Sequence, residues 1–139
     1  MKDIAFDLDD VICWHHPQYD ELGIEKYKYC EPIESGVELV NEYYEKGYEI
    51  IIYTARGMGV YKGNVNLVYE NLYQLTYDCL VRWGVKFHRL VMGKLSYDLF
   101  IDGGIISSQG ESTIVEIEDG NVKVLRKGSI SEEEIKELN

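Results

Sequence analysis

The sequence has little positive charge. Its 139 residues include 25 Asp and Glu against 14 Lys and Arg, for a formal net charge of −11. Nucleic acids and anionic membrane surfaces are bound by clustered Lys and Arg, so this balance argues against both as partners. The chain also lacks the run of roughly 18 apolar residues that a membrane-spanning helix needs, and it has no basic, apolar leader. We therefore expect a cytoplasmic protein that acts on a small molecule.

Cysteine is scarce as well. The chain has Cys13, Cys30 and Cys79, an odd number without the C-x-x-C spacing typical of zinc sites. These three are predicted to be reduced thiols, which excludes both a disulfide framework and a zinc site. The chain has no internal repeat and no low-complexity linker, and a single domain spanning residues 1–139 is expected.

Hydrophobic periodicity predicts that strands and helices alternate. Buried strands are expected at residues 3–8, 48–54, 86–92 and 98–102. Helices are expected at residues 36–46 and 66–83, and a glycine follows each of them. Ser35 and Glu38 form a capping-box pattern at the start of the first helix. This alternation is typical of an α/β fold with a three-layer, doubly wound (Rossmann-like), mostly parallel sheet.

Two segments lie outside this alternation. Residues 12–34 connect the first strand to the first helix; they are too few for a cap domain and are expected to form a short flap. In the tail, two alternating runs flank Asp119-Gly120, a strong hairpin signal, and a capping-box pattern follows. A β-hairpin and a short helix are therefore expected over about residues 112–138.

Polar side chains stand where the predicted strands end. Asp7 and Asp9 follow the first strand in "DLDDV", Thr54 ends the second, Lys94 follows the third, and Asp102 ends the fourth. Ligands of doubly wound sheets bind beyond the carboxyl ends of the strands, so these groups are expected to converge. Three converging carboxylates suit a hard, oxygen-preferring dication such as Mg²⁺, and a lysine and a hydroxyl beside it would accept a phosphate.

These motifs resemble those of the haloacid dehalogenase-like phosphotransferases. That family has D-x-D-x-[T/V] after an apolar strand, here "DLDDV", a Thr or Ser ending the second strand, here "IIIYT", a Lys, here in "MGKLS", and an acid ending a strand, here "DLFID". "TARG" and "GKLSYDLFIDG" are similar to a small capless subgroup often found with capsule or surface-polysaccharide genes. Two residues depart from the pattern: Asp10 replaces the usual Gly, and Gly103 stands where many members have a second Asp.

The resemblance implies a Mg²⁺-dependent phosphomonoesterase that acts through an aspartyl-phosphate on a small sugar or polyol phosphate, in the setting of surface-polysaccharide biosynthesis. Asp7 would be the nucleophile, and Asp9 the general acid and base. The charge of Lys94 and the hydroxyl of Thr54 would offset the charge of the phosphoryl oxygens. Mg²⁺ would be held by Asp7, the backbone carbonyl of Asp9, and Asp102.

Substrate contacts are expected from the strand ends and from the flap. The candidates are Thr54, Ala55, Arg56, Lys94, His15 and His16. Two alternatives stay open here. The adjacent histidines contact substrate or are ordinary polar loop residues, and Arg56 reaches a substrate phosphate or carboxylate or forms a structural ion pair. Without a cap domain, the open site is closed by homo-oligomerisation or accepts bulkier substrates.

Two other functions remain as alternatives. Response-regulator receiver domains have a similar length and also place acids, a Thr or Ser and a Lys around Mg²⁺, but their phosphate-accepting Asp ends the third strand. Here the third strand, "FHRLVM", contains no acid. A polynucleotide 3′-phosphatase of the same superfamily fits the motifs, but a net charge of −11 does not suit a nucleic-acid substrate.

Overall fold

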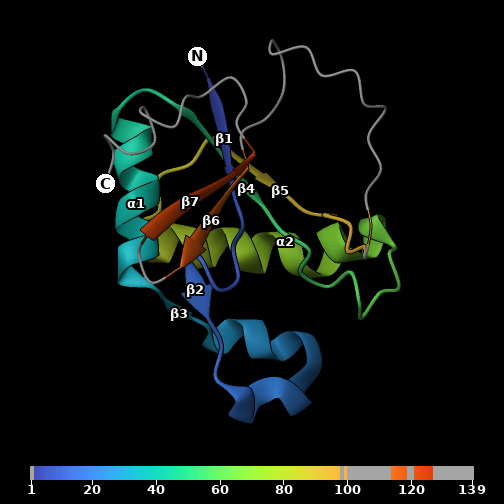
Figure 1. The fold of residues 1–139 in the computed structure, drawn as a ribbon. Helices are drawn as coiled ribbons and strands as arrows, with labels where there is room; N and C mark the ends of the chain where they lie inside the picture. The colour runs from blue at the N-terminus through green and yellow to red at the C-terminus, as the bar shows by residue number, and fades with distance from the viewer. Residues whose placement is uncertain (1, 98, 100–113, 119–120, 127–139) are drawn as a thin grey trace. The chain divides into compact units, whose positions relative to one another are not determined.

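A computed structural model describes residues 2–97, 99, 114–118 and 121–126 (Figure 1). The chain divides into two compact units, Met1–Ser96 and Tyr97–Asn139, whereas the sequence predicts one domain. The first unit contains the strands and helices around the predicted site. The second contains a hairpin. The predicted metal ligand Asp102 falls outside the described residues, and of the predicted strand at residues 98–102 the structure describes Leu99 alone, which is not assigned to a strand.

A three-stranded parallel sheet forms the centre of the first unit. Its strands are β1 (Asp3–Phe6), β4 (Glu49–Tyr53) and β5 (Arg89–Val91), in the order β1-β4-β5. Ile52 pairs with Phe6 on one side and with Leu90 on the other, so the buried side chains of the three strands lie in register on one face. The predicted α/β class with a parallel sheet is confirmed for these strands.

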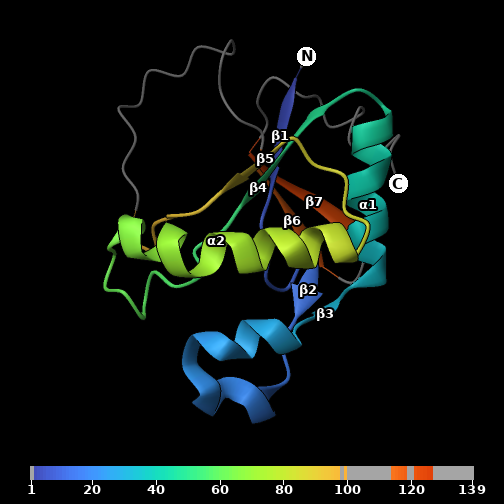
Figure 2. The same cartoon turned by 180° about the vertical axis from the view of Figure 1, so that it is seen from behind.

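Two helices cover the buried face. They are α1 (Glu34–Glu45) and α2 (Val65–Arg82), and Figure 2 shows α2 running across the strands. Each successive strand, β1, then β4, then β5, is added on the same side of the previous one. Right-handed crossovers between strands added in this order place both connecting helices on the same face of the sheet. The Phe6 ring accordingly packs edge-on against Tyr43 of α1, with ring centroids 5.7 Å apart.

The start of α1 differs from the prediction. The N-cap is Ile33, without a side-chain cap, and Ser35 lies within the first turn of the helix. The backbone amide of Ile33 donates to the carbonyl of Ile12, 2.7 Å away, so a long-range contact fixes where the helix begins. The N-cap of α2, in contrast, is a local side-chain cap, because the Asn64 side chain accepts a hydrogen bond from the Leu67 amide.

Gly36 lets α1 approach the loop after β1. A Cβ atom at this position would stand 1.8 Å from the backbone carbonyl oxygen of Val11. We expect Gly36→Ala to lower the free energy of unfolding by at least the upper part of the ~1–3 kcal/mol range for overpacking, because backbone must move to relieve the clash. Gly59→Ala is the matched control, since nothing lies within 4 Å of its Cβ. Urea unfolding of the two variants measures the difference, and equal midpoints would contradict it.

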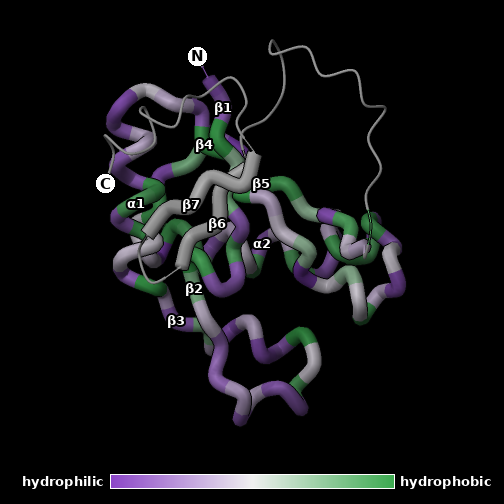
Figure 3. The backbone as a smooth tube through the Cα atoms, viewed as in Figure 1, coloured by the Kyte–Doolittle hydropathy of each residue, from purple (hydrophilic) through white to green (hydrophobic). Residues whose placement is uncertain are grey.

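Residues 12–34 form an antiparallel ribbon with a helical tip. The ribbon strands are β2 (Cys13–Trp14) and β3 (Glu31–Pro32), and the tip is the 3₁₀ segment η1 (Pro17–Tyr29), which kinks at Gly23. No residue of η1 is buried, and Figure 3 shows that the segment is mostly hydrophilic. The tip therefore has no core of its own. Residues 12–34 as a whole are called the flap below.

The second unit contains the predicted hairpin. Strands β6 (Ile114–Glu118) and β7 (Asn121–Arg126) pair antiparallel, with an irregularity between Ile114 and Val115, and this confirms the prediction. The predicted final helix falls outside the described residues. Among the helices that the structure describes, none is long and apolar enough to cross a membrane.

Candidate functional site

Asp7 and Lys94 meet beyond the carboxyl ends of the strands. Lys94 Nζ lies 3.2 Å from Asp7 Oδ2, although β4 separates the strands that the two residues follow. The other carboxylate oxygen, Oδ1, accepts a hydrogen bond of 2.9 Å from the Leu8 amide. The Asp7 and Lys94 side chains remain 47% and 37% exposed. The pair is therefore oriented by the protein and still open to a solute.

Thr54 lies between these two residues, at the end of β4. Its amide donates to the Val91 carbonyl, 3.0 Å away, and its carbonyl accepts from the Lys94 amide, 3.1 Å away. Its hydroxyl accepts a 3.1 Å hydrogen bond from the Arg56 amide. Because a hydroxyl has a proton as well as lone pairs, this bond leaves the proton for donation. Thr54 is only 1% exposed, so an anion must enter between the strand ends to receive that proton. Ala55, also predicted to bind substrate, is half-buried, and its carbonyl accepts from the Met58 amide.

A tight turn after β1 places Asp9. Three successive amides, those of Val11, Ile12 and Cys13, donate to the Leu8 carbonyl. Asp10 has φ = +69° in this turn, a conformation that favours glycine and that Asp tolerates better than most residues. The departure from the resembled family's usual glycine is therefore compatible with the same backbone turn.

Asp9 is bound by Arg56 through both carboxylate oxygens. Arg56 Nε lies 3.1 Å from Oδ2 and 3.3 Å from Oδ1, and Nη2 lies 2.9 Å from Oδ1. Arg56 is only 2% exposed, and its guanidinium lies over the Tyr27 ring, 4.4 Å from the centroid. Of the two alternatives for Arg56, this placement favours the structural ion pair, because a buried guanidinium is not open to a substrate.

The ion pair fixes the charge of Arg56. Burial by itself would lower the pKa of the guanidinium, but the hydrogen bonds and charge of Asp9 more than offset it, so the pKa is raised. Guanidinium donors occupy both oxygens of the Asp9 carboxylate. Asp9 must therefore leave this pair before it can act as a general acid, a constraint that the sequence did not reveal.

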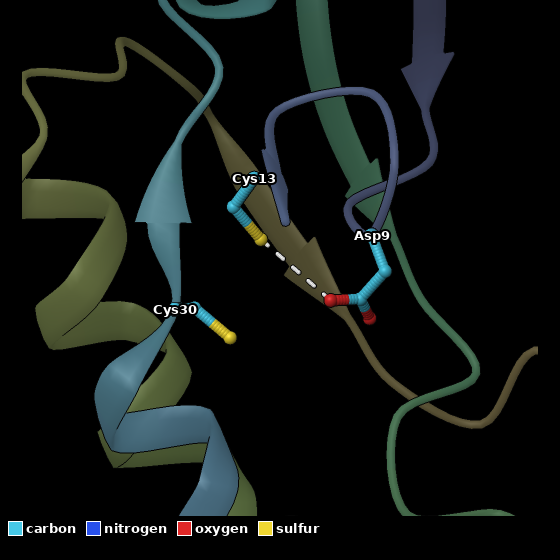
Figure 4. A group of neighbouring side chains, drawn as sticks. All are labelled: Asp9, Cys13 and Cys30. Carbon is cyan, nitrogen blue, oxygen red and sulfur yellow. Dashed lines mark hydrogen bonds between the residues drawn. The ribbon is translucent and has the colours of Figure 1, made fainter. Parts of the chain in front are cut away.

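Two thiols complete the surroundings of Arg56. Side-chain ligand atoms of Asp9, Cys13 and Cys30 lie within 4.8 Å of one another and point to a common region (Figure 4). Arg56 Nη2 lies 2.9 Å from Asp9 Oδ1, 3.2 Å from the Cys13 sulfur and 3.4 Å from the Cys30 sulfur. The nitrogen thus takes the central place that a metal ion would need. The cluster is an arginine site, and its thiols are too soft for Mg²⁺.

The two thiols of this cluster have different proton affinities. Interaction with the Cys13 thiol, together with the charge of Arg56 nearby, lowers the pKa of Cys30 to about 7, although burial opposes this. Interaction with Cys30, together with burial, raises the pKa of Cys13. Cys13 is therefore the thiol that keeps its proton, and it donates to Asp9 Oδ1, 3.6 Å from its sulfur (Figure 4).

The two flap histidines pair with acids of the flap. His16 Nε2 lies 2.9 Å from Glu31 Oε2, and the His16 ring lies 4.2 Å from the Trp14 ring. His15 Nε2 lies 3.4 Å from Asp20 Oδ1, and its buried Nδ1 has no hydrogen-bond partner among the residues that the structure describes. The structure places both histidines on the flap without bringing them into the Asp7–Lys94 pair.

The donors near Asp7 fit a hard metal ion better than the thiol cluster does. The Asp7 carboxylate and the backbone carbonyl of Asp9 supply oxygen, the ligand atom that Mg²⁺ prefers. Mg²⁺ usually keeps several waters and takes only one or two carboxylates, so the half-exposed position of Asp7 suits it. The third predicted ligand, Asp102, lies outside the described residues.

Comparison with known proteins identifies a structural relative without a stated activity. No family model matches the chain, and no curated protein matches it. The crystal structure of a structural-genomics target from Vibrio cholerae is similar, with a TM-score of 0.60 and 28% sequence identity. The likeness covers 73% of this chain and 80% of that protein. It therefore extends beyond the three-stranded sheet, and it supports the α/β architecture.

Proposed function

We propose that this protein is a phosphomonoesterase that uses Asp7 as its nucleophile. The observation that carries the proposal is the half-exposed carboxylate of Asp7, oriented by the Leu8 amide and placed 3.2 Å from Lys94 Nζ. Thr54, tied by two backbone hydrogen bonds to the segment of Lys94, adds a hydroxyl to the same strand ends. A nucleophile beside a cation and a hydroxyl donor is what phosphoryl transfer requires.

The chain's own groups account for each step. An Asp7 oxygen attacks phosphorus, and an aspartyl-phosphate forms while the alcohol departs. Lys94 and the Thr54 hydroxyl offset the charge on the phosphoryl oxygens. Asp9, once it has left Arg56 and taken up a proton from solvent, protonates the departing alcohol and then takes a proton from the attacking water. Mg²⁺ held by Asp7, the Asp9 carbonyl and Asp102 would supply further neutralisation of phosphoryl charge.

The strand order supports this function over that of a receiver domain. In receiver domains the first strand lies between the second and third, an order written 2-1-3, whereas the Rossmann order begins 3-2-1. Here β4, the second parallel strand, lies between β1 and β5, which is the 3-2-1 arrangement. The residues after β5 also present Lys94 where a receiver has its acid. We propose a Rossmann-like, haloacid dehalogenase-like fold on these grounds. The third layer and the doubly wound strand order stay predictions, because both described helices cover one face of the sheet.

The proposed substrate is a small sugar or polyol phosphate, with surface-polysaccharide biosynthesis as the setting. The net charge of −11 disfavours a polynucleotide. On the flap, the half-exposed rings of Trp14 (38%) and Tyr29 (48%) offer apolar surface to a small ring-shaped substrate. The test is a panel of phosphomonoesters incubated with the purified protein and Mg²⁺. Release of phosphate from sugar or polyol phosphates is expected, and a panel with no substrate would contradict the proposal.

Activity is expected to depend on a divalent metal. Excess EDTA should abolish phosphate release, and added Mg²⁺ or Mn²⁺ should restore it, because Asp7 and Asp9 supply hard oxygen donors to phosphoryl chemistry. The measurement is the initial rate of phosphate release before chelation, after chelation, and after the metal is returned. Full activity in excess EDTA would exclude the proposed metal.

A further inference from the structure

The Cys13 and Cys30 thiols face each other across the base of the flap. Cys13 begins β2, and Cys30 immediately precedes β3, so the two residues belong to opposite arms of one ribbon. Their sulfur atoms lie within 4.8 Å of each other, and both cysteines are free (Figure 4). The sequence-based expectation of unrelated reduced thiols did not anticipate this juxtaposition.

We propose that Cys13 and Cys30 form an oxidisable pair, which a hydroperoxide closes into a disulfide across the base of the flap, and that closure loosens the hold of Arg56 on Asp9. The disulfide is independent of the proposed function. Only its effect on turnover rests on the phosphatase assignment.

The chemistry assigns different roles to the two sulfurs. Cys30 keeps a small exposed surface, 6%, whereas Cys13 is fully buried, so the hydroperoxide reaches Cys30 first. Arg56 Nη2 lies 3.4 Å from the Cys30 sulfur, and a neighbouring cation favours the thiolate, which is the reactive form. With hydrogen peroxide, the thiolate attacks one oxygen, the O–O bond breaks and a sulfenic acid forms, while the other oxygen leaves as hydroxide and is protonated to water. The Cys13 thiol then attacks the sulfenic sulfur, forming the S–S bond and releasing a second water.

Closure must change the surroundings of Arg56. A disulfide bond is about 2.05 Å long, so the two sulfurs must move together from their present separation of up to 4.8 Å. Both sulfurs now accept from Arg56 Nη2, the same nitrogen that binds Asp9 Oδ1. A neutral disulfide is a poorer partner for a buried cation than a thiol and thiolate pair. The guanidinium is therefore expected to shift, and Asp9 with it.

The test treats the full chain with hydrogen peroxide, removes the excess with catalase, and measures intact mass and thiol content. The expected product has lost two hydrogen atoms in mass and two of its three free thiols. Peptide mapping under non-reducing conditions should find the Cys13 peptide linked to the Cys30 peptide. Dithiothreitol should restore the original mass and thiol content. Cys79→Ala, in which a buried thiol of α2 is removed, should form the same disulfide. Cys30→Ala should not form it.

Each other outcome counts against the proposal. Persistence of all three thiols, oxidation only to sulfinic or sulfonic acid, or a disulfide that involves Cys79 would overturn the pair. If the disulfide forms and the phosphatase rate of the oxidised protein equals that of the reduced protein, the link to Arg56 and Asp9 is overturned. If neither form hydrolyses any phosphomonoester, the proposed function fails, and the mass and peptide map still decide the disulfide. These readouts on the unmodified protein do not depend on whether any variant folds.

Discussion

Asp7→Asn is expected to reduce turnover by roughly 10⁴-fold or more, the scale seen when a covalent nucleophile is removed. An amide oxygen is too weak a nucleophile to form the acyl-phosphate. The fold should survive, because the Asp7–Lys94 pair is exposed on both sides, and exposed pairs contribute about 0–1 kcal/mol. The measurement is kcat for p-nitrophenyl phosphate with Mg²⁺, together with the thermal midpoint, which should change little.

Asp10→Asn is the matched control for this substitution. Asp10 is an exposed acid in the same turn, and asparagine tolerates its positive φ. The substitution therefore removes one negative charge from the turn, keeps the backbone conformation and leaves the proposed nucleophile in place. Its turnover should stay within a few-fold of the unmodified protein. Beryllium fluoride, a phosphoryl mimic, should bind at Asp7 in the control and not in Asp7→Asn. If Asp7→Asn turned over and the phosphoryl group appeared on another acid, the receiver-type function would regain support.

The Asp7–Thr54–Lys94 arrangement could be predicted from the sequence because it follows from a topological rule. Parallel strands end at the same edge of a sheet, so residues within about one turn of the ends of β1, β4 and β5 must come together. The prediction needed only the strand positions, and the periodicity placed these to within a few residues. Small errors at the strand ends do not matter here, since backbone bonds between Thr54 and Lys94 bring the segments together.

The Arg56 cluster could not be predicted in the same way. Arg56 lies three residues past the end of β4, in a turn where no periodicity determines which way a side chain points. Its partners Cys13 and Cys30 lie on opposite arms of the flap, and cysteine spacing along the chain says nothing about a ribbon that folds back on itself. The start of α1 shows the same limit, because the contact between Ile33 and Ile12 overrides the local capping signal of Ser35.

A useful signal was nevertheless present at Arg56. An arginine next to a predicted pair of acids can either serve the substrate or neutralise one of the acids, and both alternatives were open from the sequence. Burial decides between them: at 2% exposure the guanidinium needs a protein carboxylate, and Asp9 supplies it. The crowded acids of the opening segment are thus stabilised by two different cations, with Lys94 beside Asp7 and Arg56 beside Asp9.

Arg56→Met is expected to destabilise the protein and to misplace Asp9. Removing one partner of a buried ion pair costs ~3–5 kcal/mol, and the lower end applies because the Asp9 side chain is 29% exposed. Arg56→Lys keeps the charge but cannot bind both carboxylate oxygens through one planar group, so it should recover only part of the loss. Urea unfolding measures the change. Arg82→Met, at the exposed end of α2, is the control and should stay within about 0.5 kcal/mol.

The kinetics of the same variants separate a positioning role for Arg56 from a purely structural one. p-Nitrophenolate leaves without a proton, whereas the alcohol of an alkyl or sugar phosphate needs one from Asp9. If Arg56 positions Asp9, kcat in Arg56→Met should fall by an additional factor of about 10–100 for alkyl phosphates relative to p-nitrophenyl phosphate, within the ~10²–10⁴-fold contribution of a general acid. Arg56→Lys should fall between that variant and the unmodified protein. Both substrates are measured below the unfolding temperature of each variant. Equal losses of kcat on the two substrates would limit Arg56 to stabilising the fold. A group that only holds the turn together cannot distinguish between leaving groups.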